Sequence, residues 1–128
     1  MPMTPQKLPF QIMRIGTIVI VAIAFEITTI AGKRLQKLLE NELLSDEIKH
    51  VILSPYSNAY NGYITTNEEY QIQQYEGGHT VFGQWTLGAV KQICFDLVNE
   101  FKKPVKKRNL ISDIIEFPLE RELHLLEY

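Results

Sequence analysis

A β-branched apolar run, followed at once by an amphipathic segment and a second apolar run, constrains the fold of this chain more than any other feature. The first run spans Thr17 to Phe25 and is dominated by Ile and Val, which favours a buried strand with both faces covered. Apolar residues then recur at three- and four-residue spacing from Ile30 to Leu43, as in a helix lying on a sheet. Lys49 to Leu53 predicts a short strand. The strand–helix–strand segment over residues 17–53 has the length of a βαβ crossover, so we expect the two strands to pair in parallel.

Two further segments extend this unit. Gln11 to Ile15 alternates between polar and apolar residues, and Gly16 marks a turn, so a hairpin with the next strand is expected. A second amphipathic helix is predicted from Val81 to about Phe101. Its apolar residues are a row at four-residue steps, Trp85, Ala89, Ile93, Leu97 and Phe101, with Val90, Cys94 and Val98 beside this row. We therefore expect an α/β fold, a mixed sheet with a βαβ-like unit and two amphipathic helices packed on it. A length of 128 residues fits a single domain, residues 1–128.

Polar residues follow both strands of the predicted crossover. Glu26 stands between the apolar strand and the helix, where a carboxylate either faces the helix N-terminus or serves as a ligand held on rigid backbone. A tyrosine-rich segment, residues 57–70, follows the second strand. Phenols donate and accept hydrogen bonds and ligate metals when deprotonated, although a hydrogen-bonded surface loop would show the same pattern. Because sites in open α/β sheets form where parallel strands end, we expect Glu26 and this segment at one sheet edge.

Composition and charge exclude several classes of protein. A net charge of -2 gives no electrostatic reason to expect nucleic-acid binding. Cys94 is the only cysteine, which excludes an intramolecular disulfide and a cysteine-based zinc site, and its place on the apolar side of a helix indicates core packing. The longest apolar run is far shorter than the ~20 residues of a membrane-spanning helix. No signal-peptide cleavage site follows this run.

Two weaker patterns remain. Glu76 and His79 have the spacing of a metal-binding pair, but the glycines between them argue against a helix, and a structural role is the better interpretation. Residues 102–108 are strongly basic and broken by Pro104, which indicates a solvated linker, with a membrane-surface patch as the alternative. Residues 109–128 mix apolar pairs with glutamates and are expected to form a strand or a docking extension, so 103–128 together make a basic linker and tail.

Two long motifs resemble segments of the neutral (alkaline, non-lysosomal) ceramidases. The first, from Ile15 to Leu35, reads I-G-x-x-x-I-V-x-x-x-x-E-x-T-T-x-A-G-x-R-L. The second, from Ser57 to Leu87, reads S-N-x-Y-x-G-Y-I-T-T-x-E-E-Y-x-x-Q-x-Y-E-G-x-H-T-x-x-G-x-W-T-L. The resemblance covers about residues 8–102 and implies an α/β catalytic domain, of which this chain looks like the C-terminal third. Two ordered motifs at a compatible separation make this resemblance specific.

The resemblance implies a zinc-dependent hydrolase that cleaves the N-acyl amide of ceramide to sphingosine and fatty acid. The family holds one zinc ion with two histidines, a glutamate and a tyrosine, and the glutamate matches Glu26 and the tyrosine matches Tyr63. Tyr75 matches a tyrosine that contacts the reacting amide or its oxyanion, which makes it the expected catalytic residue. Tyr60 and Tyr70 are left as scaffold. Zinc accepts carboxylate, imidazole and, less often, phenolate ligands, so these roles are chemically coherent.

The resemblance also implies what is missing. The family's two zinc-binding histidines lie in an N-terminal half without counterpart here, and His50, His79 and His124 do not match them. With two of four ligands, the chain is expected to bind zinc weakly and to be inactive alone, as a fragment, a truncated product or one piece of a split enzyme. An N-terminal partner chain would then supply the two histidines. The alternatives are a non-catalytic remnant acting as a small lipid- or protein-interaction module and, more weakly, a membrane-surface adaptor. Family members are typically secreted or membrane-associated, which leaves the localisation open.

Overall fold

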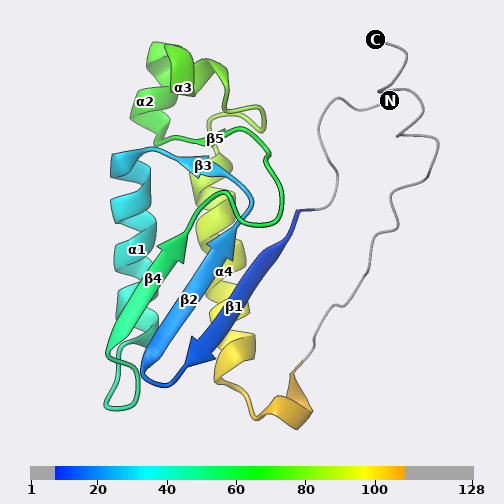
Figure 1. The fold of residues 1–128 in the computed structure, drawn as a ribbon. Helices are drawn as coiled ribbons and strands as arrows, with labels where there is room; N and C mark the ends of the chain where they lie inside the picture. The colour runs from blue at the N-terminus through cyan, green and yellow to red at the C-terminus, as the bar shows by residue number, and fades with distance from the viewer. Residues whose placement is uncertain (1–7, 109–128) are drawn as a thin grey trace, which may run out of the picture.

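The described part of the chain, residues 8–108 of a computed structural model, is built on a three-stranded sheet with helices on one face (Figure 1). β1 (Phe10–Ile15) and β2 (Ile18–Ile23) form an antiparallel hairpin. β2 pairs in parallel with β4 (His50–Ser54). The tight turn between β1 and β2 contains Gly16 at a φ of 60°, a conformation that glycine adopts without a steric penalty. The predicted hairpin and the predicted parallel pair are therefore both confirmed, in one mixed sheet.

The crossover between β2 and β4 is made by α1 (Thr29–Leu43), which begins where the sequence predicts. The Thr28 side chain accepts a hydrogen bond from the backbone N–H of Ala31 and so caps the helix. One face of α1 is buried against the sheet and α4; its buried residues are Ala31, Leu35, Leu39 and Leu43. The apolar stripe thus fixes the helix on the sheet and confirms the βαβ unit.

The second long helix, α4 (Thr86–Lys102), begins later than the predicted start at Val81 because the preceding residues form turns around Gly83. The predicted row at four-residue steps is not the buried face of α4, since Ile93 in this row is 42% exposed. A strict four-residue step drifts by about 40° per step around a helix with 3.6 residues per turn. The stripe that packs on the core consists of Leu87 and of the three residues expected beside that row: Val90, Cys94 and Val98. The predicted core position of Cys94 is confirmed.

A small second sheet lies above the carboxyl ends of β2 and β4 (Figure 1). The apolar strand ends earlier than predicted, because the chain bends at residues 24–25. β3 (Glu26–Ile27) then pairs in parallel with β5 (Tyr63–Ile64). After β5 the chain forms two short helices, α2 (Asn67–Ile72) and α3 (Tyr75–Gly78). Gly77 and Gly78 lie in α3, so the expectation that the glycines between Glu76 and His79 prevent a helix is wrong.

The two faces of the main sheet differ. α1 and α4 both cover the face that carries Val19, Val21 and Ile23, which are fully buried (Figure 1). Within residues 8–108 no helix covers the opposite face, so the expectation that both faces of β2 are covered is wrong for this part of the chain. The fold is otherwise the mixed α/β arrangement that the sequence predicts.

The basic segment after α4 is exposed, as expected of a solvated segment, but it is anchored at both ends. Lys102 forms a 2.9 Å ion pair with Glu42 of α1. A short helical turn, η1 (Val105–Lys107), leads to Arg108, whose guanidinium donates to the Phe101 carbonyl oxygen at 2.7 Å. The expected strand or docking extension at 109–128 lies outside the described residues, and a single domain over 1–128 stays a prediction. No helix among those described is long and apolar enough to cross a membrane.

Candidate functional site

Glu26 lies on β3, directly beside the tyrosine-rich segment. Its register partner across the small sheet is Tyr63, and its backbone N–H donates to the carbonyl oxygen of Gly62 at 3.1 Å. Two residues later, the Thr28 N–H donates to the carbonyl oxygen of Ile64 at 3.1 Å. Backbone hydrogen bonds therefore hold the glutamate and the tyrosine segment together at the carboxyl ends of β2 and β4, as the sequence predicts.

Three phenols surround the Glu26 carboxylate. The Tyr60 hydroxyl donates to Glu26 Oε2 at 3.0 Å, and the hydroxyls of Tyr56 and Tyr63 also hydrogen-bond to this side chain. These hydrogen bonds lower the pKa of Glu26, with the largest effect from Tyr56 and the next from Tyr63, although partial burial of the carboxylate opposes the shift. Glu26 forms no salt bridge with any lysine or arginine in residues 8–108. The site is thus an ionised carboxylate held by neutral donors.

The same contacts act on the phenols in the opposite direction. The hydrogen bond to the Glu26 carboxylate, with a smaller effect of burial, raises the pKa of Tyr56 to about 12. The pKa of Tyr63 is raised further above its ordinary value, for the same reasons. Burial first, and the bond to Glu26 second, raise the pKa of Tyr60. All three hydroxyls therefore keep their protons at neutral pH and are available as hydrogen-bond donors.

Tyr75, on α3, extends the cluster on the side of Tyr63. The two rings meet edge to face with centroids 5.9 Å apart, and the His79 ring lies 4.4 Å from Tyr75. The His79 ring atom Nδ1 lies 2.7 Å from the Tyr75 carbonyl oxygen, which fixes the imidazole against α3. Tyr75 is 67% exposed, so its hydroxyl is open to a ligand. The structure therefore brings Glu26, Tyr63 and Tyr75 together.

A close backbone approach positions β5 in this cluster. The Tyr63 N–H donates to the His79 carbonyl oxygen at 3.0 Å, and that oxygen lies only 2.5 Å from where a side-chain carbon on Gly62 would stand. Gly62 also has a φ of 76°, so only glycine fits without strain. Beneath it, the buried Asn61 side chain donates to the Ala24 carbonyl oxygen at 2.9 Å. The segment is rigid because these buried polar groups are paired.

A second network ties α2 to α1. Thr66 and Glu69 form a capping box, in which the Glu69 carboxylate accepts from the Thr66 N–H at 2.8 Å. The same carboxylate accepts from the Thr28 hydroxyl at 2.6 Å. Arg34 of α1 pairs with Glu68 at 3.0 Å. The N-terminal ends of α1 and α2, which flank the cluster, are thus linked to each other through residues of the E-x-T-T and T-T-x-E-E motifs.

Two tyrosines of the cluster could not be predicted from the sequence. Tyr56 lies outside the predicted segment, and Tyr60 was expected to be scaffold, yet both hydroxyls contact Glu26 and their rings stack 6.2 Å apart. The available signal was the position of Tyr56, which follows the end of β4 and adopts a left-handed φ of 57°. Tyr70, also expected to be scaffold, lies on α2. Backbone conformation of this kind cannot be read from spacing alone.

The donor set suits a hard or borderline cation only in part. Residues 8–108 contain no group of three or more histidine, cysteine, aspartate or glutamate side chains that could hold a metal ion. Glu26 supplies a carboxylate and Tyr63 a phenol, which are two oxygen donors, whereas a tetrahedral zinc site takes four ligands. The arrangement supplies in addition several phenol donors for a negatively charged oxygen.

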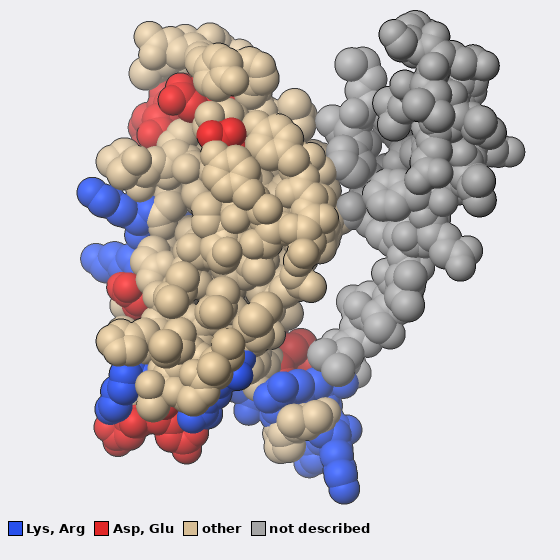
Figure 2. Space-filling model, viewed as in Figure 1, with Lys and Arg blue, Asp and Glu red and all other residues tan. Residues whose placement is uncertain are grey.

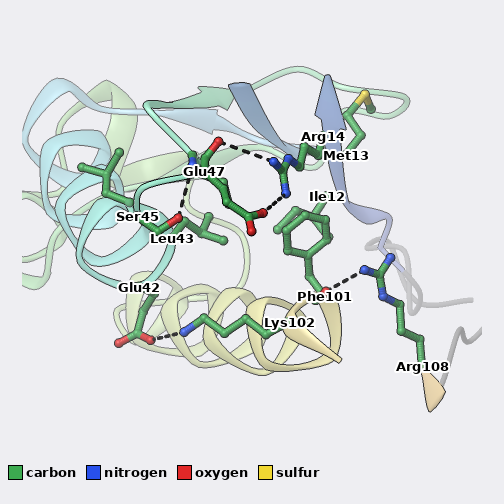
Figure 3. Close-up of a pocket in the computed structure, with 12 residues that line it drawn as sticks. Ile12, Met13, Arg14, Glu42, Leu43, Ser45, Glu47, Phe101, Lys102 and Arg108 are labelled. Carbon is green, nitrogen blue, oxygen red and sulfur yellow. Dashed lines mark hydrogen bonds and ion pairs between the residues drawn. The ribbon is translucent and has the colours of Figure 1, made fainter. Parts of the chain in front are cut away.

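A separate groove of about 580 Å³ lies at the opposite end of the sheet, between β1, the loop after α1 and the end of α4 (Figure 3). Its walls carry the 2.9 Å ion pair between Arg14 and Glu47, and the pair between Lys102 and Glu42. These opposite charges compensate each other within the walls. The groove includes none of the predicted site residues and is a structural feature rather than part of the site.

Comparison with known proteins gives concordant matches. The sequence model described as "Neutral/alkaline non-lysosomal ceramidase, N-terminal" matches residues 1–92. Neutral ceramidase of Pseudomonas aeruginosa is 36% identical over 115 residues, which is 88% of this chain and 17% of that protein. Neutral ceramidase B of Dictyostelium discoideum is 46% identical over 93 residues, 71% of this chain and 13% of that protein. The crystal structure of the Pseudomonas aeruginosa enzyme superposes with a TM-score of 0.75 at 37% identity, over 85% of this chain and 18% of that one.

These matches confirm the resemblance and correct its placement. We expected the C-terminal part of the catalytic domain, and this is wrong, because the matching model describes the N-terminal part of these proteins. The chain spans less than a fifth of the length of the relatives it matches. The matched residues include Glu26, Tyr63 and Tyr75, so the whole cluster lies within the region of similarity.

Proposed function

Because the chain belongs to the neutral/alkaline non-lysosomal ceramidase family, we propose that it forms part of a ceramidase catalytic site. The reaction is hydrolysis of the N-acyl amide of ceramide to sphingosine and fatty acid, with zinc as the cofactor. One observation supports this proposal above the others: Glu26, Tyr63 and Tyr75, from separate elements, converge at the carboxyl ends of the parallel strands. The activity is that of a whole enzyme to which this chain contributes.

Within that site, Glu26 and Tyr63 would hold the zinc ion. When bound, zinc polarises an amide carbonyl and acidifies a bound water. The lowered pKa of Glu26 keeps its carboxylate ionised at neutral pH, ready to bind a cation. Tyr63 would bind as a phenolate, and its raised pKa in the isolated chain means that it must first lose a proton that now points to Glu26. This proton opposes zinc binding by the isolated chain.

Tyr75 is the proposed catalytic residue. It is exposed and in edge contact with the Tyr63 ring, so its hydroxyl can donate to the oxyanion that develops when the amide is attacked. Tyr56 and Tyr60 are positioning residues that orient the Glu26 carboxylate through their hydrogen bonds. The remaining ligands would come from residues outside this sequence, since the chain spans less than a fifth of its relatives.

The proposal predicts that the isolated chain does not hydrolyse ceramide. The purified chain is incubated with zinc and a fluorescent ceramide, alone and co-expressed with a Pseudomonas aeruginosa neutral ceramidase from which the matching segment is deleted. Turnover is expected only for the combined polypeptides and is expected to fall with Glu26→Gln or Tyr63→Phe. Tyr70→Phe is the matched control. Robust turnover by the isolated chain, or an assembly indifferent to Glu26→Gln, would contradict the proposal.

A second candidate is a non-catalytic remnant that serves as a small lipid- or protein-interaction module. The observation that favours it is that phenol hydroxyls already donate to the Glu26 carboxylate. Zinc stoichiometry separates the two functions, because a remnant gains no tight zinc when the missing part of the enzyme is added.

A further inference from the structure

The face of the main sheet opposite the helices carries two apolar rows, which we call the outer face. The strand register places Ile15 beside Ile18, which in turn lies beside the exposed His50 at the sheet edge, and Met13 beside Ile20, which in turn lies beside Ile52. These side chains point away from α1 and α4, since their neighbours Val19, Val21 and Val51 are the ones packed in the core. The outer face is thus defined by Met13, Ile15, Ile18, Ile20 and Ile52.

The outer face is both apolar and open. Ile15 is 63% exposed, Ile52 46% and Met13 44%, while Ile18 and Ile20 are half-buried. None of these five residues is charged, and the centre of the sheet is free of charged side chains in the space-filling view, with lysine, arginine and acidic residues confined to the rim (Figure 2). A surface of this kind is suited to permanent burial, because the cores of stable interfaces are depleted in charge.

The upper end of the same face is already covered. The segment after β4 crosses it, where the Ser57 N–H donates to the Ile23 carbonyl oxygen at 2.9 Å and the Asn58 side chain hydrogen-bonds to Gln11. This segment is also the one that brings Tyr56 and Tyr60 to Glu26. Among residues 8–108, only the two lower rows stay open, and parallel strand pairs normally have both faces covered.

We propose that the outer face docks a ceramidase polypeptide that lies outside this sequence and covers the two rows with an apolar layer. This inference rests on the proposed function, since the partner is the part of the enzyme that completes the site. Two observations favour this occupant: the chain spans less than a fifth of its relatives, and the strands that carry the outer face also end at the incomplete cluster around Glu26. A second copy of this chain would cover the face but would bring the same partial ligand set.

The chain offers a clean labelling test, because its only cysteine, Cys94, is fully buried. Ile15→Cys or Ile52→Cys each introduce a single accessible thiol on the outer face, and Lys37→Cys introduces a matched thiol on the exposed side of α1. Each full-length variant is tagged and co-expressed with Pseudomonas aeruginosa neutral ceramidase lacking the matching segment. Maleimide labelling rates are then compared with those of the variant alone at low concentration.

We expect co-purification, with labelling at Ile15→Cys and Ile52→Cys slowed at least about tenfold in the assembly and labelling at Lys37→Cys unchanged. No co-purification, or an assembly that leaves both outer-face thiols reactive, overturns the inference. Protection that grows with the concentration of the chain alone also overturns it, in favour of a second copy. Ceramide hydrolysis is assayed on the same assembly, so protection without turnover removes the proposed function and leaves the docking surface standing.

Discussion

Replacing Gly62 by alanine tests how the cluster is positioned. Gly62 has a φ of 76°, and a side-chain carbon at this position would stand 2.5 Å from the His79 carbonyl oxygen. That oxygen accepts the hydrogen bond from the Tyr63 N–H. An alanine must therefore both adopt a left-handed conformation and push the two segments apart, which breaks the contact between β5 and the end of α3.

The cost follows from these two effects. The left-handed conformation costs about 1–2 kcal/mol for a residue with a side chain, and the lost backbone hydrogen bond about 0.5–1.5 kcal/mol. Gly62→Ala should lower the free energy of unfolding by about 2–3 kcal/mol, a large share of the 5–15 kcal/mol typical of a folded domain. Gly16→Ala is the matched control, because its φ is 60° but no atom lies within 4 Å, so it should cost only about 1–2 kcal/mol.

Urea unfolding followed by circular dichroism measures both variants. Gly88→Ala, in the interior of α4 with nothing within 4 Å, should instead stabilise the chain by about 0.5–1 kcal/mol. If Gly62→Ala costs no more than Gly16→Ala, the close approach to His79 does not hold the cluster and the reasoning fails.

Three further predictions concern the cluster and the core. Glu26→Gln should lower the pKa of Tyr56 from about 12 towards 10, because the carboxylate that holds its proton is lost; ultraviolet titration of the phenols checks this, and an unchanged profile would contradict the assigned contacts. Burial raises the pKa of the Cys94 thiol to about 12, so the thiol should resist a disulfide reagent at pH 8 until the chain unfolds. The raised pKa also contributes to the free energy of unfolding: this contribution should be present below about pH 9 and should be lost as the pH rises towards 12. Leu39→Ala should cost about 2–5 kcal/mol in urea unfolding, whereas the half-exposed Leu44→Ala should cost under about 1 kcal/mol; equal costs would refute the packing of α1.

Much of the fold could be predicted because its signals are local. The β-branched run, the Thr28 cap and the stripe from Ala31 to Leu43 each determine their element with little help from tertiary contacts. The buried face of α4 could not be predicted from four-residue steps alone, because apolar residues lie on several sides of this helix and packing on the sheet decides that Val90 rather than Ile93 is covered. Likewise, the apolar pattern of β2 does not show which face of the sheet the helices cover, because residues on both faces of this strand are apolar.

The site could be predicted in part for the same reason. Glu26 and Tyr63 were placed together by the rule for parallel strands and by resemblance, and the structure brings them together through the pairing of β3 with β5. Tyr56 could not be placed on Glu26, because its position depends on the left-handed backbone at residues 56 and 58 that folds the segment back over the sheet. Zinc binding by these residues stays a proposal.

Zinc affinity, measured by isothermal titration calorimetry, tests the central claim most directly. The claim is that Glu26 and Tyr63 are part of a ceramidase zinc site whose remaining ligands lie outside this chain. The chain alone should bind zinc weakly, the assembly with the rest of a ceramidase should bind zinc tightly with one ion per assembly, and Glu26→Gln in the assembly should weaken this binding. Tight binding by the chain alone, or an assembly whose affinity is unaffected by Glu26→Gln, would contradict the claim.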